Sequence, residues 1–163
     1  MTVLRLLMFV ATTLLTAHAL AHSTLSDVSD GDEERVTLQV MPESKLLIHD
    51  TTGINVSSPD GPVQSLPLAV FLTLKSPDKV LAWYREALPD YTVLKGESGE
   101  QVQILERTGD DTRVDSLDTY QTPNVRIRPT DARMVTHMKG AKTMIQVYYP
   151  PREQAGGSDG EDS

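Results

Sequence analysis

Apolar and polar residues alternate over most of the middle of the chain, and this pattern predicts β-strands rather than helices. Each predicted strand has one apolar side, and turn-forming residues such as Pro, Gly and Asp end several of them. The predicted strands cover residues 36–40, 45–49, 54–57, 70–74, 91–94, 102–105, 125–128 and 143–149. The turn at residues 96–99 indicates that the strands on either side of it form a hairpin.

Residues 76–88 depart from this alternation and predict one main helix. Ser76 is a suitable N-cap, and Pro77 suits the first helical turn because its missing N–H has no partner there in any helix. Apolar residues spaced three and four apart then form a single stripe, namely Val80, Trp83, Tyr84, Ala87 and Leu88. Pro89 ends the helix. Because so short a helix is marginal alone, its stripe is expected to pack on a sheet.

Two segments show weaker patterns. Residues 108–124 predict a polar loop. Residues 130–141 fit a short helix, with Thr130 as its cap, or one arm of a hairpin, and a loop or strand is favoured. The predicted fold class is therefore α+β, with a curved, mostly antiparallel sheet and one main amphipathic helix (76–88) packed on one face.

Residues 1–21 predict a secretory signal peptide. A positive start containing Arg5 precedes an apolar run at residues 6–15, and small residues follow near the possible cleavage points. This run is about half the ~20 apolar residues that a membrane span needs. Cleavage is expected after Ala19 or after Ala21. We expect a soluble mature protein without a membrane span in the bacterial periplasm, with secretion as the alternative.

Charge is concentrated near the two ends of the chain. Residues 22–35 hold five acids and one arginine, and residues 152–163 hold four acids and one arginine. Both segments are rich in Ser, Gly and Asp, so we predict a disordered acidic linker and a disordered acidic tail. Residues 36–151, with 14 acids and 12 basic residues, are predicted to form a single α+β domain. A nearly balanced charge gives nucleic-acid binding no electrostatic support.

The chain has no cysteine. This excludes disulfides, thiolate metal sites and a cysteine nucleophile, so an exported domain of this sequence must be held together by an ordinary apolar core. No Ser lies in a G-x-S-x-G or S-x-x-K motif, and no glycine-rich phosphate loop is present.

Three stretches together carry a resemblance to a known type of domain. They are MPESKLLI, LAVFLTLKSPDKVLAWYREALPDYTVL and GAKTMIQVYY. They resemble small exported bacterial α+β domains of unknown function that have a PGAK-like strand start and a helix reading V-x-x-F/W-Y-R/K-x-x-L. Glu43 and Ser44 stand where such domains have Pro-Gly. The resemblance implies a fold and no particular chemistry.

His22 is a candidate copper ligand. After cleavage at Ala21 it would be the first residue, where its amine and imidazole can bind one metal ion. After cleavage at Ala19 it would be the third residue, which suits a square-planar site. A histidine placed beside the cleavage point by chance is the simpler interpretation, so no metal ligand is assigned.

Other polar residues are weaker candidates. His49 and Asp50 are neighbours on a strand and should point to opposite faces, which does not suit a base and its orienting acid. His137 has no second ligand at helical spacing. Asp110, Asp111, Asp115 and Asp118 could suggest calcium binding or a hydrolytic carboxylate pair, but they lack the order of a calcium loop and predict a solvated loop.

Arg126 and Arg128 share one face of a predicted strand, and Arg133, Lys139 and Lys142 follow. They could form a cationic patch for an anionic envelope polymer, but an ordinary exposed strand face is favoured. The sequence thus predicts a noncatalytic periplasmic protein that binds an unknown partner protein or envelope ligand, without a catalytic site or cofactor. A periplasmic copper-handling protein that uses His22 is the alternative.

Overall fold

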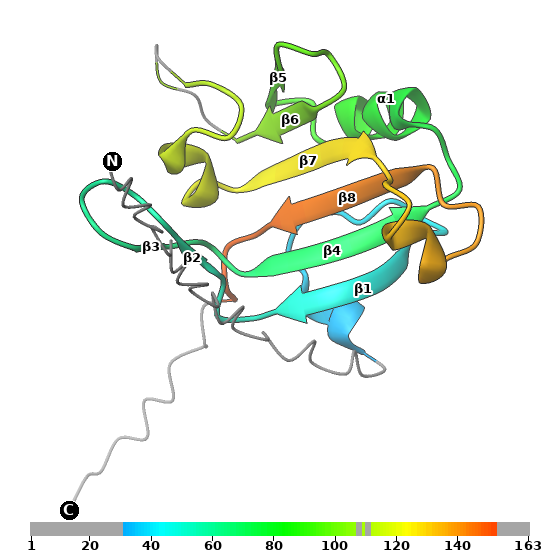
Figure 1. Cartoon of the computed structure of the whole chain (residues 1–163), viewed down its shortest axis with the longest axis horizontal. Coiled ribbons are helices and arrows are strands. Elements are labelled where there is room, and N and C mark those ends of the chain that lie inside the picture. Colours follow the sequence, from blue (N-terminus) through cyan, green and yellow to red (C-terminus); the bar gives the residue numbers. More distant parts are fainter. Residues whose placement is uncertain (1–30, 107–108, 110–111, 153–163) are drawn as a thin grey trace, which may run out of the picture.

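The computed structural model describes residues 31–106, 109 and 112–152. Six strands form one antiparallel sheet in the order β1-β4-β8-β7-β6-β5 (Figure 1). These strands are β1 (Lys45–Asp50), β4 (Leu68–Thr73), β5 (Thr92–Lys95), β6 (Val102–Leu105), β7 (Asn124–Pro129) and β8 (Thr143–Tyr148). The short strands β2 (Asn55–Val56) and β3 (Val63–Gln64) pair separately. The predicted α+β class and mostly antiparallel sheet are confirmed.

Helix α1 (Pro77–Ala87) covers part of one side of the sheet, which we call the first face. Pro77 is the first helical residue, as predicted. Ser76 adopts the extended N-cap conformation, but its hydroxyl does not make the expected capping hydrogen bond. Val80 and Tyr84 on the stripe are buried in the main core. The strands contribute their first-face residues to this core, including Phe71, Ile104, Val125, Ile127 and Ile145.

The prediction of a strand at residues 36–40 is wrong. Val36 is buried, Thr37 is exposed and Leu38 is half-buried, so the expected alternation of burial is present. None of the described strands pairs with this segment, however, because it crosses behind the sheet and packs its apolar side chains on the first face (Figure 1). The pattern therefore predicted which side chains are buried but not the hydrogen bonding of the backbone.

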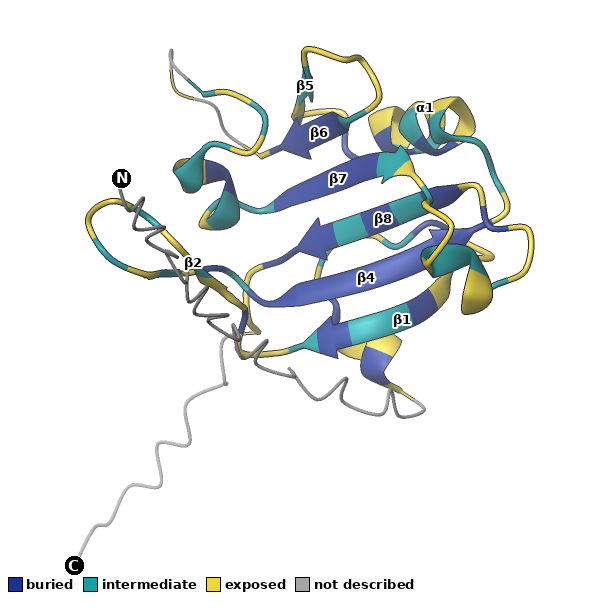
Figure 2. Ribbon diagram, viewed as in Figure 1, coloured by how far each residue is buried: buried dark blue, intermediate teal, exposed yellow. Residues whose placement is uncertain are grey.

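The opposite side of the sheet, which we call the second face, has a smaller apolar cluster. Leu68, Val70 and Tyr148 are its buried members, and Tyr120 packs against them from outside the sheet. Tyr120 ends the 3-10 helix η2 (Leu117–Tyr120), which lies in the predicted polar loop. Figure 2 shows that β4 is buried along its length, whereas β8 alternates between buried and half-buried positions.

Two further segments differ from what the sequence predicted for them. Residues 130–141, for which a loop or strand was favoured, contain the 3-10 helix η3 (Met134–Thr136) and otherwise form turns. Within residues 22–35, expected to be disordered, Asp32–Arg35 form the 3-10 helix η1. Among the described residues, no helix is long and apolar enough to cross a membrane. The predicted signal peptide and His22 lie outside the described residues.

Candidate functional site

Arg126 in β7 is buried in the second face between two tyrosine rings. Its Cζ lies 4.0 Å from the centroid of the Tyr120 ring and 4.8 Å from that of Tyr148. Its side chain is 2% exposed. Contact with two aromatic rings replaces much of the hydration that a guanidinium loses on burial.

The favoured prediction that Arg126 and Arg128 lie on an exposed strand face is therefore wrong for Arg126. Arg128 is half-buried and donates a hydrogen bond of 2.7 Å to Oε1 of Gln146. Arg126 is removed from the hypothetical cationic patch because Tyr120, which comes from the preceding loop, covers it.

Asp115 is the counterion of this buried arginine. Its Oδ1 lies 2.6 Å from Nη1 of Arg126, and its Oδ2 accepts a hydrogen bond of 2.8 Å from Nε2 of Gln101. The backbone N–H of Asp115 donates to Oε1 of Gln103 at 3.2 Å. With φ at 61°, Asp115 has a left-handed backbone that is uncommon outside glycine. The three contacts offset the cost of this conformation and fix the segment 112–116 over the second face.

Further hydrogen bonds join the helix η2, which follows this segment, to the sheet. Nη2 of Arg126 donates to Oγ1 of Thr119 at 3.0 Å. Nε2 of Gln103 donates to Oδ1 of Asn124 at 3.0 Å, and the Asn124 side chain donates to the Thr119 carbonyl. A buried polar network in which most members have partners makes the position of the loop specific.

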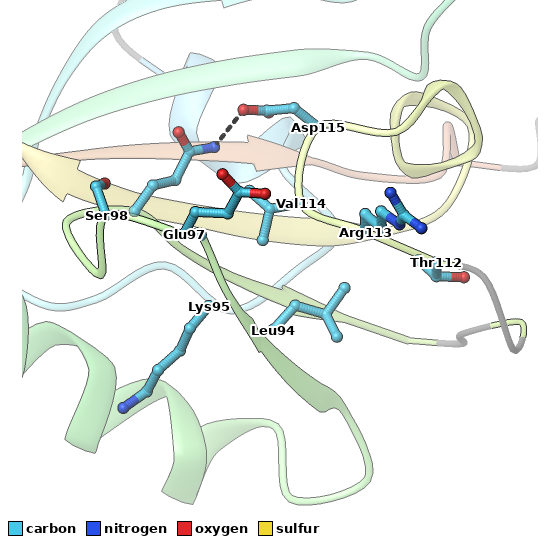
Figure 3. Close-up of a pocket in the computed structure, with 10 residues that line it drawn as sticks. Leu94, Lys95, Glu97, Ser98, Thr112, Arg113, Val114 and Asp115 are labelled. Atoms are coloured by element: carbon cyan, nitrogen blue, oxygen red, sulfur yellow. Dashed lines mark hydrogen bonds between the residues drawn. The ribbon is translucent and has the colours of Figure 1, made fainter.

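A hollow of about 620 Å³ lies between this segment and the turn that joins β5 to β6 (Figure 3). The residues that line it are Leu94, Lys95, Gly96, Glu97, Ser98, Gln101, Thr112, Arg113, Val114 and Asp115. In Figure 3, the side chains of Lys95 and Arg113 extend away from Glu97 and Asp115. Leu94 and Val114 supply apolar wall, and Gln101, Ser98 and Glu97 supply hydrogen-bonding groups. Such a mixture suits a ligand with both an apolar group and polar groups.

A second polar cluster lies on the first face around His49. Nε2 of His49 lies 2.6 Å from the Tyr149 hydroxyl, and its Nδ1 lies 3.7 Å from Oδ1 of Asp32. His49 pairs with Ala69 and Asp50 with Leu68, so the two neighbours do point to opposite faces. His49 and Tyr149 are buried, with 7% and 3% of their surfaces exposed.

This cluster is better suited to packing than to proton transfer. Burial raises the pKa of Tyr149, which disfavours the phenolate that a nucleophile or base would need. Arg35 opposes this change in pKa in part, whereas Asp32 adds to it. The contacts join η1 and β1, near the start of the described residues, to the residue that follows β8, which lies near their end.

The aspartate group predicted as a solvated loop is only partly described. Asp110 and Asp111 lie outside the described residues, and Asp118 is exposed. Within the part of the chain that the structure describes, no three His, Asp or Glu side chains gather as metal ligands would. His137 is exposed, and the hypothesis of copper binding at His22 stays a prediction.

The role of Asp115 was not predicted, although the sequence contains one sign of it. Gln103, Asn124 and Arg126 occupy strand positions whose neighbours in the sheet are buried, and all three are buried. Polar residues at such positions need partners from elsewhere in the chain. The identity of those partners depends on how the 112–123 loop folds back, which local patterns do not specify.

Neither models of protein families, nor curated proteins, nor solved structures gave a significant match to this chain. The assignment of a function therefore depends on the geometry of the candidate site.

Proposed function

We propose that the protein is an exported, noncatalytic domain that binds a partner in the hollow between the β5–β6 turn and the segment 112–115. The observation that carries this proposal is the position of Asp115. Its strained backbone is held by Gln101, Gln103 and the buried Arg126. Strained residues held in this way are frequent at ligand sites, and a wall fixed before binding reduces the ordering cost of the complex.

The nature of the lining supports binding rather than catalysis. The hollow has an apolar wall and several hydrogen-bonding groups. Of its two carboxylates, Glu97 and Asp115, the second is already paired with Arg126. His49, which could act as a general base, is buried on the first face and contacts Tyr149. A base must reach the proton that it removes, so this histidine does not serve the hollow.

The export part of the proposal derives from residues 1–21. It is tested by recovering the protein from the periplasm of a Gram-negative host and sequencing its N-terminus. A mature chain that begins at Leu20 or His22 is expected. A chain that keeps Met1 and stays in the cytoplasm would contradict export while leaving the binding site untouched.

The binding part is tested by ¹⁵N-NMR titration of the mature chain with three small probes, namely leucinamide, N-acetyl-leucine and a trimer of N-acetylglucosamine. At least one probe should shift the amide signals of Leu94, Gln101 and Val114. Val114→Arg should abolish these shifts because the longer side chain fills the hollow. Ile54→Arg is the matched control, since Ile54 is 37% exposed and does not line this hollow.

Two results would contradict a binding role for the hollow. One is that no probe moves signals from its lining. The other is that Val114→Arg and Ile54→Arg bind the probe equally well.

A further inference from the structure

The edge of the sheet beside the hollow presents main-chain groups that face outward. β5 is the last strand in the sheet order and pairs with β6 in an unbroken register from Thr92↔Leu105 to Lys95↔Val102. The N–H of Gly96 donates to the carbonyl of Gln101 at 2.8 Å. Hydrogen-bonded and non-bonded pairs alternate in an antiparallel ladder. The main chain of Leu94 therefore faces β6, and that of Val93 and Lys95 faces outward.

The other edge of the sheet is built differently. The register of β1 against β4 shifts between Leu46 and Ile48, so Leu47 is an extra residue in the strand. A bulge of this kind twists an edge strand and hinders the addition of another strand. β5 has no such irregularity, which leaves it as the edge that can accept a partner strand.

The hollow lies on the side of β5 to which Leu94 points. Leu94 pairs with Gln103, a residue of the second face, and lines the hollow together with Val114. Side chains directly opposite one another on neighbouring strands share a face of the sheet. A residue added opposite Leu94 would thus place its side chain at the hollow, against the apolar wall of Leu94 and Val114.

We propose that β5 accepts an extended segment of a partner polypeptide as an added strand, with an apolar side chain of that segment in the hollow. This inference deepens the proposed function and depends on it. Main-chain hydrogen bonds to Val93 and Lys95 would supply affinity, and the hollow would supply specificity for the side chain.

A segment of another protein fits this edge better than a second copy of the chain. β5 has four residues, and pairing of two such strands alone covers much less than the roughly 800 Å² per partner of a stable complex. In an antiparallel β5–β5 pair, the residue opposite Leu94 would be a second Leu94 or Thr92, the two β5 residues on that face. Leu94 already forms the wall of its own hollow, and Thr92 is polar. A segment of another protein would both pair with β5 and place a side chain in the hollow.

The probe for the test is the capped peptide Thr-Val-Thr-Leu-Thr-Val-Thr, whose apolar residues share one face. We expect the amide signals of Val93 and Lys95 to shift in ¹⁵N-NMR spectra of the mature chain and their hydrogen exchange to slow. Replacing the central Leu of the peptide by Asp should weaken binding at least about tenfold, because the hollow wall is apolar.

The decisive variant is Lys95→Pro. Lys95 is exposed, and its N–H faces outward rather than toward β6. Removing this N–H should therefore leave the hydrogen bonds between β5 and β6 intact. Binding of the peptide should fall at least about tenfold, whereas Lys95→Gln should bind as the unaltered protein does. Methylating the peptide nitrogens that face β5 provides the same test without altering the protein, which covers the case that Lys95→Pro does not fold.

Several outcomes would overturn the inference. The peptide could bind equally well after Lys95→Pro and after methylation, or shift signals far from β5. A dimer of the mature chain in sedimentation that dissociates in Lys95→Pro would assign the edge to a second copy. If the peptide fails to bind but the small probes still shift signals in the hollow, the strand-addition inference fails and the proposed binding function stands.

Discussion

Nε2 of His49 lies 2.6 Å from the hydroxyl of Tyr149, although 100 residues separate them in sequence. The two rings are close to parallel, with an interplanar angle of 24° and a centroid distance of 6.1 Å. Because both side chains are buried, water does not reach their polar atoms. The His49 ring nitrogen and the Tyr149 hydroxyl therefore serve as hydrogen-bond partners for each other.

Removing one member of this pair should destabilise the fold. Tyr149→Phe leaves Nε2 of His49 buried without its partner, and we expect the free energy of unfolding to fall by about 1–3 kcal/mol. The double variant His49→Phe with Tyr149→Phe should lose less than the sum of the two single variants. Urea unfolding followed by circular dichroism measures these values, and simple additivity would show that the contact contributes nothing.

Arg126 should be the basic residue of the sheet whose replacement costs most. Arg126→Ala removes contacts with Tyr120 and Tyr148 and leaves Asp115 without its counterion. We expect a loss of about 2–4 kcal/mol of stability, measured by thermal unfolding, because the side chain is a buried member of an ion pair. Because the Asp115 side chain is 44% exposed, water can solvate its carboxylate in the variant. The expected loss of stability is therefore smaller than for an ion pair in which both members are buried.

Two controls separate charge from geometry at this position. Arg126→Lys keeps the charge but loses the planar group that lies against both rings, so it should recover only part of the stability. Arg133→Ala, at an exposed position, should change stability by no more than about 0.5 kcal/mol. Equal effects of Arg133→Ala and Arg126→Ala would contradict the role of the buried guanidinium.

Buried tyrosines should make the protein sensitive to alkali. Burial raises the pKa of Tyr84 above its ordinary value of 10.0, with a partial opposing effect of the Met41 backbone. The folded state then holds this proton more tightly than the unfolded state. The stability that this proton contributes is accordingly complete below about pH 10 and is lost as the pH rises from 10 toward the higher pKa of the folded state. Burial also raises the pKa of Tyr148 and that of Tyr149, so both tyrosines add to this sensitivity to alkali.

Tyr84→Phe tests this pH dependence directly. The Met41 backbone lies near the Tyr84 hydroxyl, but among the described residues this hydroxyl makes no hydrogen bond of ordinary distance and angle. Its removal at pH 7 should therefore change stability by less than about 1 kcal/mol. Between pH 10 and 12 the variant should unfold less readily than the unaltered protein in urea titrations. Parallel stability curves for the two proteins over this range would contradict the prediction.

Gly53 should tolerate no larger side chain. Its φ is 77°, and a Cβ added there would lie 2.3 Å from the carbonyl oxygen of Ser65. Gly53→Ala is expected to lower stability by more than about 2 kcal/mol, as strain and a backbone clash add together. Gly99→Ala is a matched control because Gly99 has a φ of 73° and open space around it. It should cost about 1 kcal/mol, and equal costs would show that the clash relaxes.

Local sequence patterns predicted those elements whose geometry depends on near neighbours. Ser76, Pro77 and Pro89 placed the helix within one residue of its ends, and strand β6 has the predicted limits. Alternation also predicted which side chains of the segment 36–40 turn toward the core, since one side of an extended chain packs on the core with or without a hydrogen-bonded partner strand. The curvature of the sheet stays a prediction.

The candidate site could not be predicted in the same way. Arg126 was predicted to lie on an exposed strand face. Its partners, Tyr120 and Asp115, come from a loop without a periodic pattern, so no local pattern indicates that they cover it. His49 likewise meets Asp32 and Tyr149 from opposite ends of the described chain. Such contacts depend on tertiary packing, which a single sequence without aligned relatives does not encode in local spacing.

The place of β8 in the sheet has a consequence for biosynthesis. β8 is the last strand of the described residues, yet it joins β4 to β7, so without it the sheet separates into β1-β4 and β7-β6-β5. A growing polypeptide therefore keeps its apolar strands available to chaperones until β8 has left the ribosome. Under the proposed export, this delay would keep the chain unfolded for passage through a membrane channel. A chain that ends at residue 142 should give the circular dichroism spectrum of an unfolded protein, and a cooperative melting transition in that fragment would refute the idea.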